Sequence, residues 1–127
     1  NVTSIIYFAQ TNPDTFNGDL TLIVSNTGRL YMANIASDDN SVGGNTFTMN
    51  ADFTNSGSGY LRLGNGNFDT YSVNVTLKNT GSRHIYIAYN GSDHSVARDF
   101  NTSNSGTGTS GIYIDSGNTS TYPLMVI

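Results

Sequence analysis

The chain has 127 residues, a formal net charge of −4 and 36% hydrophobic residues, and it contains no cysteine. This length fits one domain, and fourteen Tyr and Phe residues at low charge favour a folded core over disorder. The absence of a basic cluster excludes an electrostatic site for nucleic acid, and no apolar run is long enough to span a membrane.

Strand-forming residues dominate the composition, and short runs of alternating apolar and polar residues are separated by Gly, Asn and Ser. We therefore expect an all-β chain, with strands at 2–9, 19–25, 29–36, 46–54, 59–63, 71–78, 83–89, 111–115 and 121–127. Segments 37–45, 64–70 and 90–110 are predicted to be loops.

The first strand differs from the others because residues 2–8 are apolar on both faces toward their end. A polar stretch containing Pro13 follows, and proline cannot donate to a strand ladder. We expect residues 1–10 to form an N-terminal strand, 11–18 a tether and 19–127 a single β-sandwich domain. The strand either closes its own domain or inserts into a neighbouring molecule. The residues of this candidate donor strand are Val2, Ser4, Ile5, Ile6, Tyr7 and Phe8.

Three segments share a pattern in which an alternating apolar strand precedes Asn-Thr-Gly or Asn-Ser-Gly. The turns begin at Asn26, Asn55 and Asn79, and another strand follows each of them. Asn and Gly tolerate a positive φ, so each unit is interpreted as a hairpin. The repeated pairs predict an antiparallel, Ig-like or pilin-like β-sandwich of short strands. Its expected core is Leu20, Leu22, Val24, Met49, Ala51, Phe53, Val73, Val75, Leu77, Ile85 and Ile87.

Five Asn-X-Ser/Thr sequons lie in strand or turn-like segments, where a glycan is tolerated. We expect N-linked glycans at several of them. The sequons begin at Asn1, Asn74, Asn90, Asn101 and Asn118.

No residue pattern predicts catalysis, a metal or a cofactor. The acidic turns around Asp38 and Asp69 do not have the spacing of an EF-hand, and His84 and His94 have no partner ligand at a suitable spacing. The nucleophilic Gly-X-Ser-X-Gly motif is absent. We therefore expect a protein that is not an enzyme.

The segment Val73-Asn-Val-Thr-Leu-Lys-Asn-Thr-Gly81, the lack of cysteine and the sequons resemble subunits of archaeal extracellular filaments, namely threads and TasA-like bundling pili. The resemblance implies a glycosylated, pilin-like homopolymer that assembles head-to-tail by donor-strand complementation, in adhesion or biofilms. The start at Asn1 suggests a removed signal peptide and an extracellular location. Two alternatives remain: a cell-surface adhesin or carbohydrate-binding module, for which the eight tyrosines could form a platform, and a viral capsid or tail protein.

Overall fold

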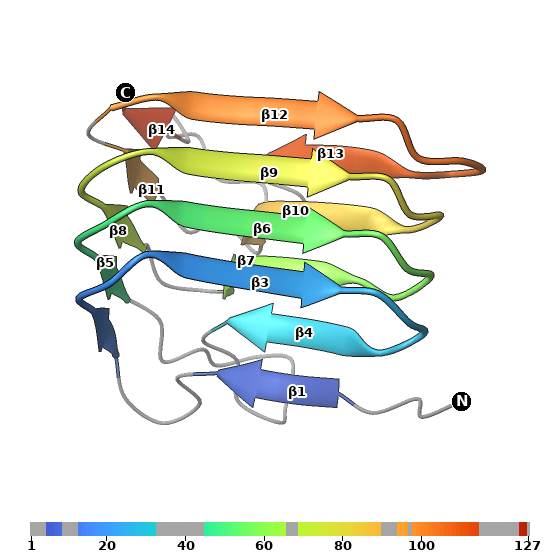
Figure 1. Cartoon of the computed structure of the whole chain (residues 1–127), viewed down its shortest axis with the longest axis horizontal. Coiled ribbons are helices and arrows are strands. Elements are labelled where there is room, and N and C mark those ends of the chain that lie inside the picture. Colours follow the sequence, from blue (N-terminus) through green and yellow to red (C-terminus); the bar gives the residue numbers. More distant parts are fainter. Residues whose placement is uncertain are drawn as a thin grey trace.

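The computed structural model describes residues 5–8, 13–32, 45–65, 69–89, 94–96, 98–114 and 125–126. These residues form fourteen β-strands in three sheets, and every strand pair is parallel. Figure 1 shows equivalent strands stacked directly above one another along the molecule. The all-β prediction is confirmed, but the predicted antiparallel, Ig-like sandwich is wrong.

Sheet A contains β1 (Ile5–Phe8), β4 (Arg29–Met32), β7 (Leu61–Asn65), β10 (His84–Tyr89) and β13 (Gly111–Ile114), in that order. Sheet B contains β2 (Thr15–Phe16), β5 (Thr46–Phe47), β8 (Thr70–Tyr71), β11 (His94–Val96) and β14 (Met125–Val126). Sheet C contains β3 (Leu20–Val24), β6 (Ala51–Asn55), β9 (Val75–Asn79) and β12 (Phe100–Asn104).

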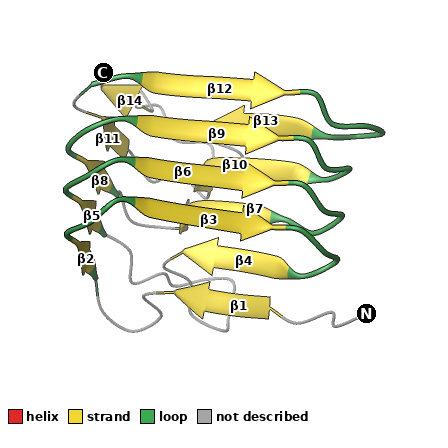
Figure 2. Ribbon diagram, viewed as in Figure 1, coloured by secondary structure: helices red, strands yellow, loops and turns green. Residues whose placement is uncertain are grey.

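The chain passes through sheets B, C and A in turn, so that each set of three strands makes one coil of a parallel β-helix (Figure 2). We number the coils I (β2–β4), II (β5–β7), III (β8–β10) and IV (β11–β13). β1 precedes coil I in sheet A, and β14 follows coil IV in sheet B. We call the end with β1 and β3 the lower end.

The repeated turns connect different sheets, which is why the hairpin interpretation was wrong. Asn55-Ser56-Gly57 carries the chain from β6 to β7, and each of these strands pairs with its equivalent in the next coil. Hydrogen bonds between equivalent positions join residues 31, 24 and 25 apart in sequence. A recurrence of this length is the signature of a stacked repeat rather than of hairpins.

The register also corrects the alignment of the first repeat. Val24, and not Asn26, lies opposite Asn55, which in turn lies opposite Asn79 and Asn104. The fourth turn, Asn104-Ser105-Gly106, belongs to the same series.

The core lies between the three sheets, where the inward residues of equivalent strands stack in columns. Phe16, Phe47 and Tyr71 form one such column in sheet B, with centroid distances of 4.9 and 4.6 Å and nearly parallel rings. Phe47 and Tyr71 are fully buried, whereas Phe16, in the lowest coil, is only partly buried. Burying large aromatic side chains supplies much of the apolar stabilisation of a fold without disulfides.

The predicted core is largely confirmed. Seven of its residues are buried, namely Val24, Ala51, Phe53, Val75, Leu77, Ile85 and Ile87. Leu20 and Leu22 are partly buried against them. Met49 is 45% exposed and Val73 is only half-buried, so these two predictions were wrong. Both residues lie at corners between sheets B and C, where the alternation of a continuous strand does not apply.

β1 pairs with β4 of the same chain, with Ile5 opposite Arg29 and Phe8 opposite Met32. Of the two alternatives for this segment, the described residues show pairing within its own chain. Insertion of the segment into a neighbouring molecule stays a prediction. Val2 and Ser4 lie outside the described residues. β2 lies within the segment expected to be a tether.

Candidate functional site

The outer face of sheet A carries a group of aromatic and basic side chains. Leu61 and Leu63 of β7 point into the core, so their neighbours Tyr60 and Arg62 point outward, as strand alternation requires. The same alternation places His84 and Tyr86 of the next coil outward, beside buried Ile85 and Ile87. We call this surface the tyrosine–arginine face; it consists of Arg29, Tyr60, Arg62, Arg83, His84, Tyr86 and Tyr113.

Parallel register brings these residues together although they are far apart in sequence. Arg62 lies opposite Tyr86, and Tyr86 lies opposite Tyr113. Adjacent strands of a sheet are about 4.8 Å apart, so side chains on successive coils are in contact range. With Arg29 in β4, the face therefore crosses coils I to IV in the direction of the helix axis.

Three tyrosine rings lie nearly parallel along this direction. The Tyr60 and Tyr86 centroids are 6.1 Å apart with an interplanar angle of 28°, and those of Tyr86 and Tyr113 are 5.4 Å apart at 25°. Tyr113 is 44% exposed, whereas Tyr60 and Tyr86 are half-buried. The row thus presents apolar ring surface and phenol hydroxyls side by side, a combination suited to an amphipathic ligand.

His84 lies among these rings, 4.9 Å from the Tyr113 centroid and 5.4 Å from that of Tyr86, with both contacts edge-to-face. Its Nδ1 is buried and has no hydrogen-bond partner among the residues that the structure describes. Loss of solvation, and secondarily the nearby charge of Arg83, lower the pKa of His84 below its ordinary value of 6.5. The lowered pKa favours the neutral imidazole at pH 7.

The guanidinium groups lie against the same rings. Arg29 and Arg83 each lie 5.4 Å from the Tyr60 centroid, and Arg83 Nη1 donates a hydrogen bond of 3.1 Å to the Tyr60 hydroxyl. Arg62 lies 4.8 Å from the ring of Tyr31, which is only 3% exposed, and 5.9 Å from that of Tyr86. Cation–π contacts of this kind hold flat guanidinium groups in place.

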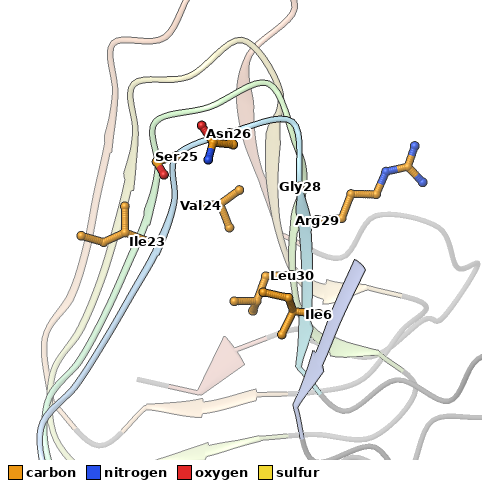
Figure 3. A pocket seen from close by; sticks show the side chains of 8 residues that line it. All are labelled: Ile6, Ile23, Val24, Ser25, Asn26, Gly28, Arg29 and Leu30. Atoms are coloured by element: carbon orange, nitrogen blue, oxygen red, sulfur yellow. The ribbon is translucent and has the colours of Figure 1, made fainter. Parts of the chain in front are cut away.

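A pocket lies at the lower end, where β1 extends sheet A one strand beyond β3 (Figure 3). Val24, Leu30 and Ile6 point into it, whereas Arg29 and Ile23 point away. Ile6 is 54% exposed although it faces the core, because sheet C has no described strand below β3. The pocket opens into the apolar core, and the one charged side chain among its described lining residues, that of Arg29, points away from it. Its lining is Ile6, Ile23, Val24, Ser25, Asn26, Gly28, Arg29 and Leu30.

Two of the five predicted glycosylation sites, Asn74 and Asn101, lie within the described residues. Asn101 is exposed on β12, on the outer face of sheet C. Asn74 is half-buried just before β9, and its Oδ1 accepts a hydrogen bond from Asp99 N at 3.3 Å. Asn1, Asn90 and Asn118 lie outside the described residues. Glycosylation stays a prediction at all five positions.

Among the described residues no group of three His, Cys, Asp or Glu side chains could hold a metal ion. The described part of the chain also has no helix long and apolar enough to cross a membrane.

The comparisons with known proteins add no further information about function. No family model, no curated protein and no solved structure matches the chain. The fold and the tyrosine–arginine face define a parallel β-helix with a candidate binding surface on one sheet.

Sequence reasoning suggested that tyrosines could form a platform but did not place one. Tyr60 and His84 immediately precede the core residues Leu61 and Ile85, and these two core residues lie six positions after a turn asparagine, Asn55 or Asn79. This shared spacing was the signal in the sequence. That signal becomes informative only when the turns are aligned as stacked coils.

Proposed function

We propose that the chain is a non-catalytic carbohydrate-binding module of an extracellular protein, with the tyrosine–arginine face as its binding surface. The observation that carries this proposal is the row of near-parallel rings of Tyr60, Tyr86 and Tyr113 across successive coils. Sugar rings have apolar C–H faces and hydroxyl edges, so they match a surface that alternates aromatic carbon with phenol hydroxyl and guanidinium groups.

The shape of the surface favours an extended ligand over a small one. The face belongs to the outer side of a parallel sheet rather than to an enclosed cavity, and small molecules usually occupy concave sites. The pocket of Figure 3 borders the face at Arg29, whose side chain points away from that pocket. A polysaccharide that runs along the helix axis would contact the three tyrosines in succession.

The test measures binding of the chain to a panel of immobilised neutral and acidic polysaccharides. Tyr113→Ala should weaken binding about 2- to 10-fold, because an exposed aromatic contact contributes roughly 0.5–1.5 kcal/mol beyond the area that it buries. Ile23→Ala is the matched control, because Ile23 is 59% exposed on the outer face of sheet C. Equal binding by wild type and Tyr113→Ala, or no binding to any polysaccharide, would contradict the proposal.

A filament subunit, the role that the sequence favoured, stays a prediction. β1 already pairs with β4 in its own chain, so no described feature favours strand insertion into a neighbour.

A further inference from the structure

The charges of this acidic chain are distributed unevenly. Although the net charge is −4, three of the five basic residues, Arg29, Arg62 and Arg83, belong to the tyrosine–arginine face. Every described aspartate belongs to or immediately precedes a strand of sheet B or sheet C: Asp14, Asp19, Asp52, Asp69 and Asp99. The described part of this face therefore combines three cations with no carboxylate.

The three cations belong to successive coils. Arg29 begins β4 of coil I, Arg62 is in β7 of coil II, and Arg83 immediately precedes β10 of coil III. Neighbouring coils are about 4.8 Å apart, so the three cations span about 10 Å along the helix axis. They are staggered across the sheet rather than stacked at one position, because Arg62 lies opposite Tyr31 and Tyr86. A linear polymer with repeated negative charges would meet them in the order of the coils.

The guanidinium groups are also oriented for anion recognition. Arg29 and Arg83 are exposed, and both lie 5.4 Å from the centroid of the Tyr60 ring. Of the five N–H donors of an arginine, Arg83 uses one on the Tyr60 hydroxyl. A planar group held on a ring can offer its remaining donors edge-on, in the paired geometry that carboxylate and sulfate accept.

We propose that the ligand of the tyrosine–arginine face is an acidic polysaccharide, and that the exposed Arg29 and Arg83 bind its carboxylate or sulfate groups. This inference rests on the proposed function, because it names the ligand class of the same face. The tyrosines contact the sugar rings, and the arginines make the face selective for polysaccharides that carry negative charge.

The experiment measures dissociation constants of the full chain for four polymers of matched length at low ionic strength. The probes are polygalacturonate for carboxylate, dextran sulfate for sulfate, unmodified dextran as the neutral polymer, and single-stranded DNA as a different class of polyanion. Both acidic polysaccharides should bind at least about tenfold more tightly than dextran, because charge-assisted hydrogen bonds are about twice as strong as neutral ones. Their binding should weaken as salt is added.

Two double variants that change the net charge by the same amount test whether binding of the acidic polysaccharides depends on the arginines of the face. Arg29→Gln/Arg83→Gln removes two cations of the face, whereas Lys78→Gln/Arg98→Gln removes two exposed cations associated with strands of sheet C. The first should weaken binding of the acidic polysaccharides at least about tenfold, and the second less than about twofold. All substituted side chains are exposed, so the fold should be retained.

The outcomes separate this inference from the proposed function. If dextran binds as tightly as the acidic polymers and Tyr113→Ala weakens that binding, the carbohydrate module stands and the acidic ligand is wrong. If both double variants weaken binding equally, the arginines act only through net charge and the inference is overturned. Tighter binding of DNA than of either acidic polysaccharide overturns it as well, and an absence of polysaccharide binding overturns both proposals.

Discussion

Glycines at the turns between sheets C and A allow the coils to approach one another closely. A Cβ added to Gly57 would lie 2.2 Å from the backbone oxygen of Asn26, and one added to Gly81 or Gly106 would lie 2.1 Å from the oxygen of the glycine below. Real Cβ atoms do not approach backbone oxygens this closely. The glycines are therefore required by space, because each turn packs directly on the previous one.

This packing predicts the effect of two glycine substitutions. Gly57→Ala should destabilise the fold by about 2–3 kcal/mol, because the obstructing atoms belong to the backbone of the coil below and cannot rotate away. Gly18→Ala is the control, since a Cβ there would meet no atom within 4 Å, and it should change stability by less than about 0.5 kcal/mol. Urea unfolding of both variants measures the difference. Equal stability of the two variants would show that the turns are not packed in this way.

Buried asparagines support the same turns from inside. Asn79 Nδ2 donates to the carbonyl oxygens of Arg83 at 2.8 Å and Gly111 at 3.1 Å, and its Oδ1 accepts from Gly81 N at 3.3 Å. Asn79 is fully buried. An unpaired buried polar group is costly, so these three bonds make the side chain specific for an amide.

Asn79→Asp should therefore be strongly destabilising at neutral pH, by about 3 kcal/mol or more, because a buried carboxylate would face two carbonyl oxygens. Burial raises the pKa of the introduced carboxyl in the folded state, so the loss of stability should shrink as the pH is lowered and the group is protonated. Asn104→Asp is the matched control on the exposed fourth turn. A pH-independent loss, or equal losses at both positions, would contradict the hydrogen-bond assignment.

Strand pairing within each sheet determines which side chains are neighbours on the surface. On sheet A, His84 is surrounded by the rings of Tyr60, Tyr86 and Tyr113 and lies near the charge of Arg83. Desolvation and that charge lower the pKa of His84, so the imidazole takes up a proton only below the ordinary range near pH 6.5. Protonation then adds a cation to the tyrosine–arginine face.

We therefore expect the affinity for dextran sulfate to increase as the pH falls through the lowered pKa of His84, because sulfate keeps its charge over that range. A bound anion favours the imidazolium, and by linkage binding takes up a proton. His84→Gln should flatten this increase. The measurement is the slope of affinity against pH between about 7.5 and 4.5. An unchanged slope in the variant would mean that another group is responsible.

The sequence predicted strand positions well where apolar and polar residues alternate. It predicted them poorly where a polar segment becomes a strand only through backbone pairing with a neighbouring coil. β11 and β12 lie in the segment predicted to be a loop, and β12 has polar Thr102 at the position where the neighbouring coil has Leu77. Backbone pairing with β9 makes this polar segment a strand. The candidate site could not be predicted for a related reason, because Arg62 and Tyr86 become neighbours only through parallel pairing.

The molecule as a whole has two different ends. At the lower end, Ile6, Leu20 and Leu22 are only partly covered, whereas β12 in coil IV has polar Thr102 at the inward position where coil III has Leu77. Terminal coils of stacked repeats usually carry such polar substitutions, because no equivalent coil covers them. The described part of coil IV therefore has features of a terminal coil, whereas coil I leaves apolar surface open.

Asn26 occupies the position in coil I at which coils II, III and IV have glycine. Its side chain would collide with the backbone of any turn of the same shape placed beneath it, just as an added Cβ at Gly57 would collide with Asn26 itself. An additional coil produced by tandem duplication would therefore fit between the existing coils but not below coil I. A gene that doubled the segment 51–74 would place glycine over glycine and lengthen the binding face by one coil. The same unit added below coil I would require a change at Asn26 first, so lengthening by duplication is directional.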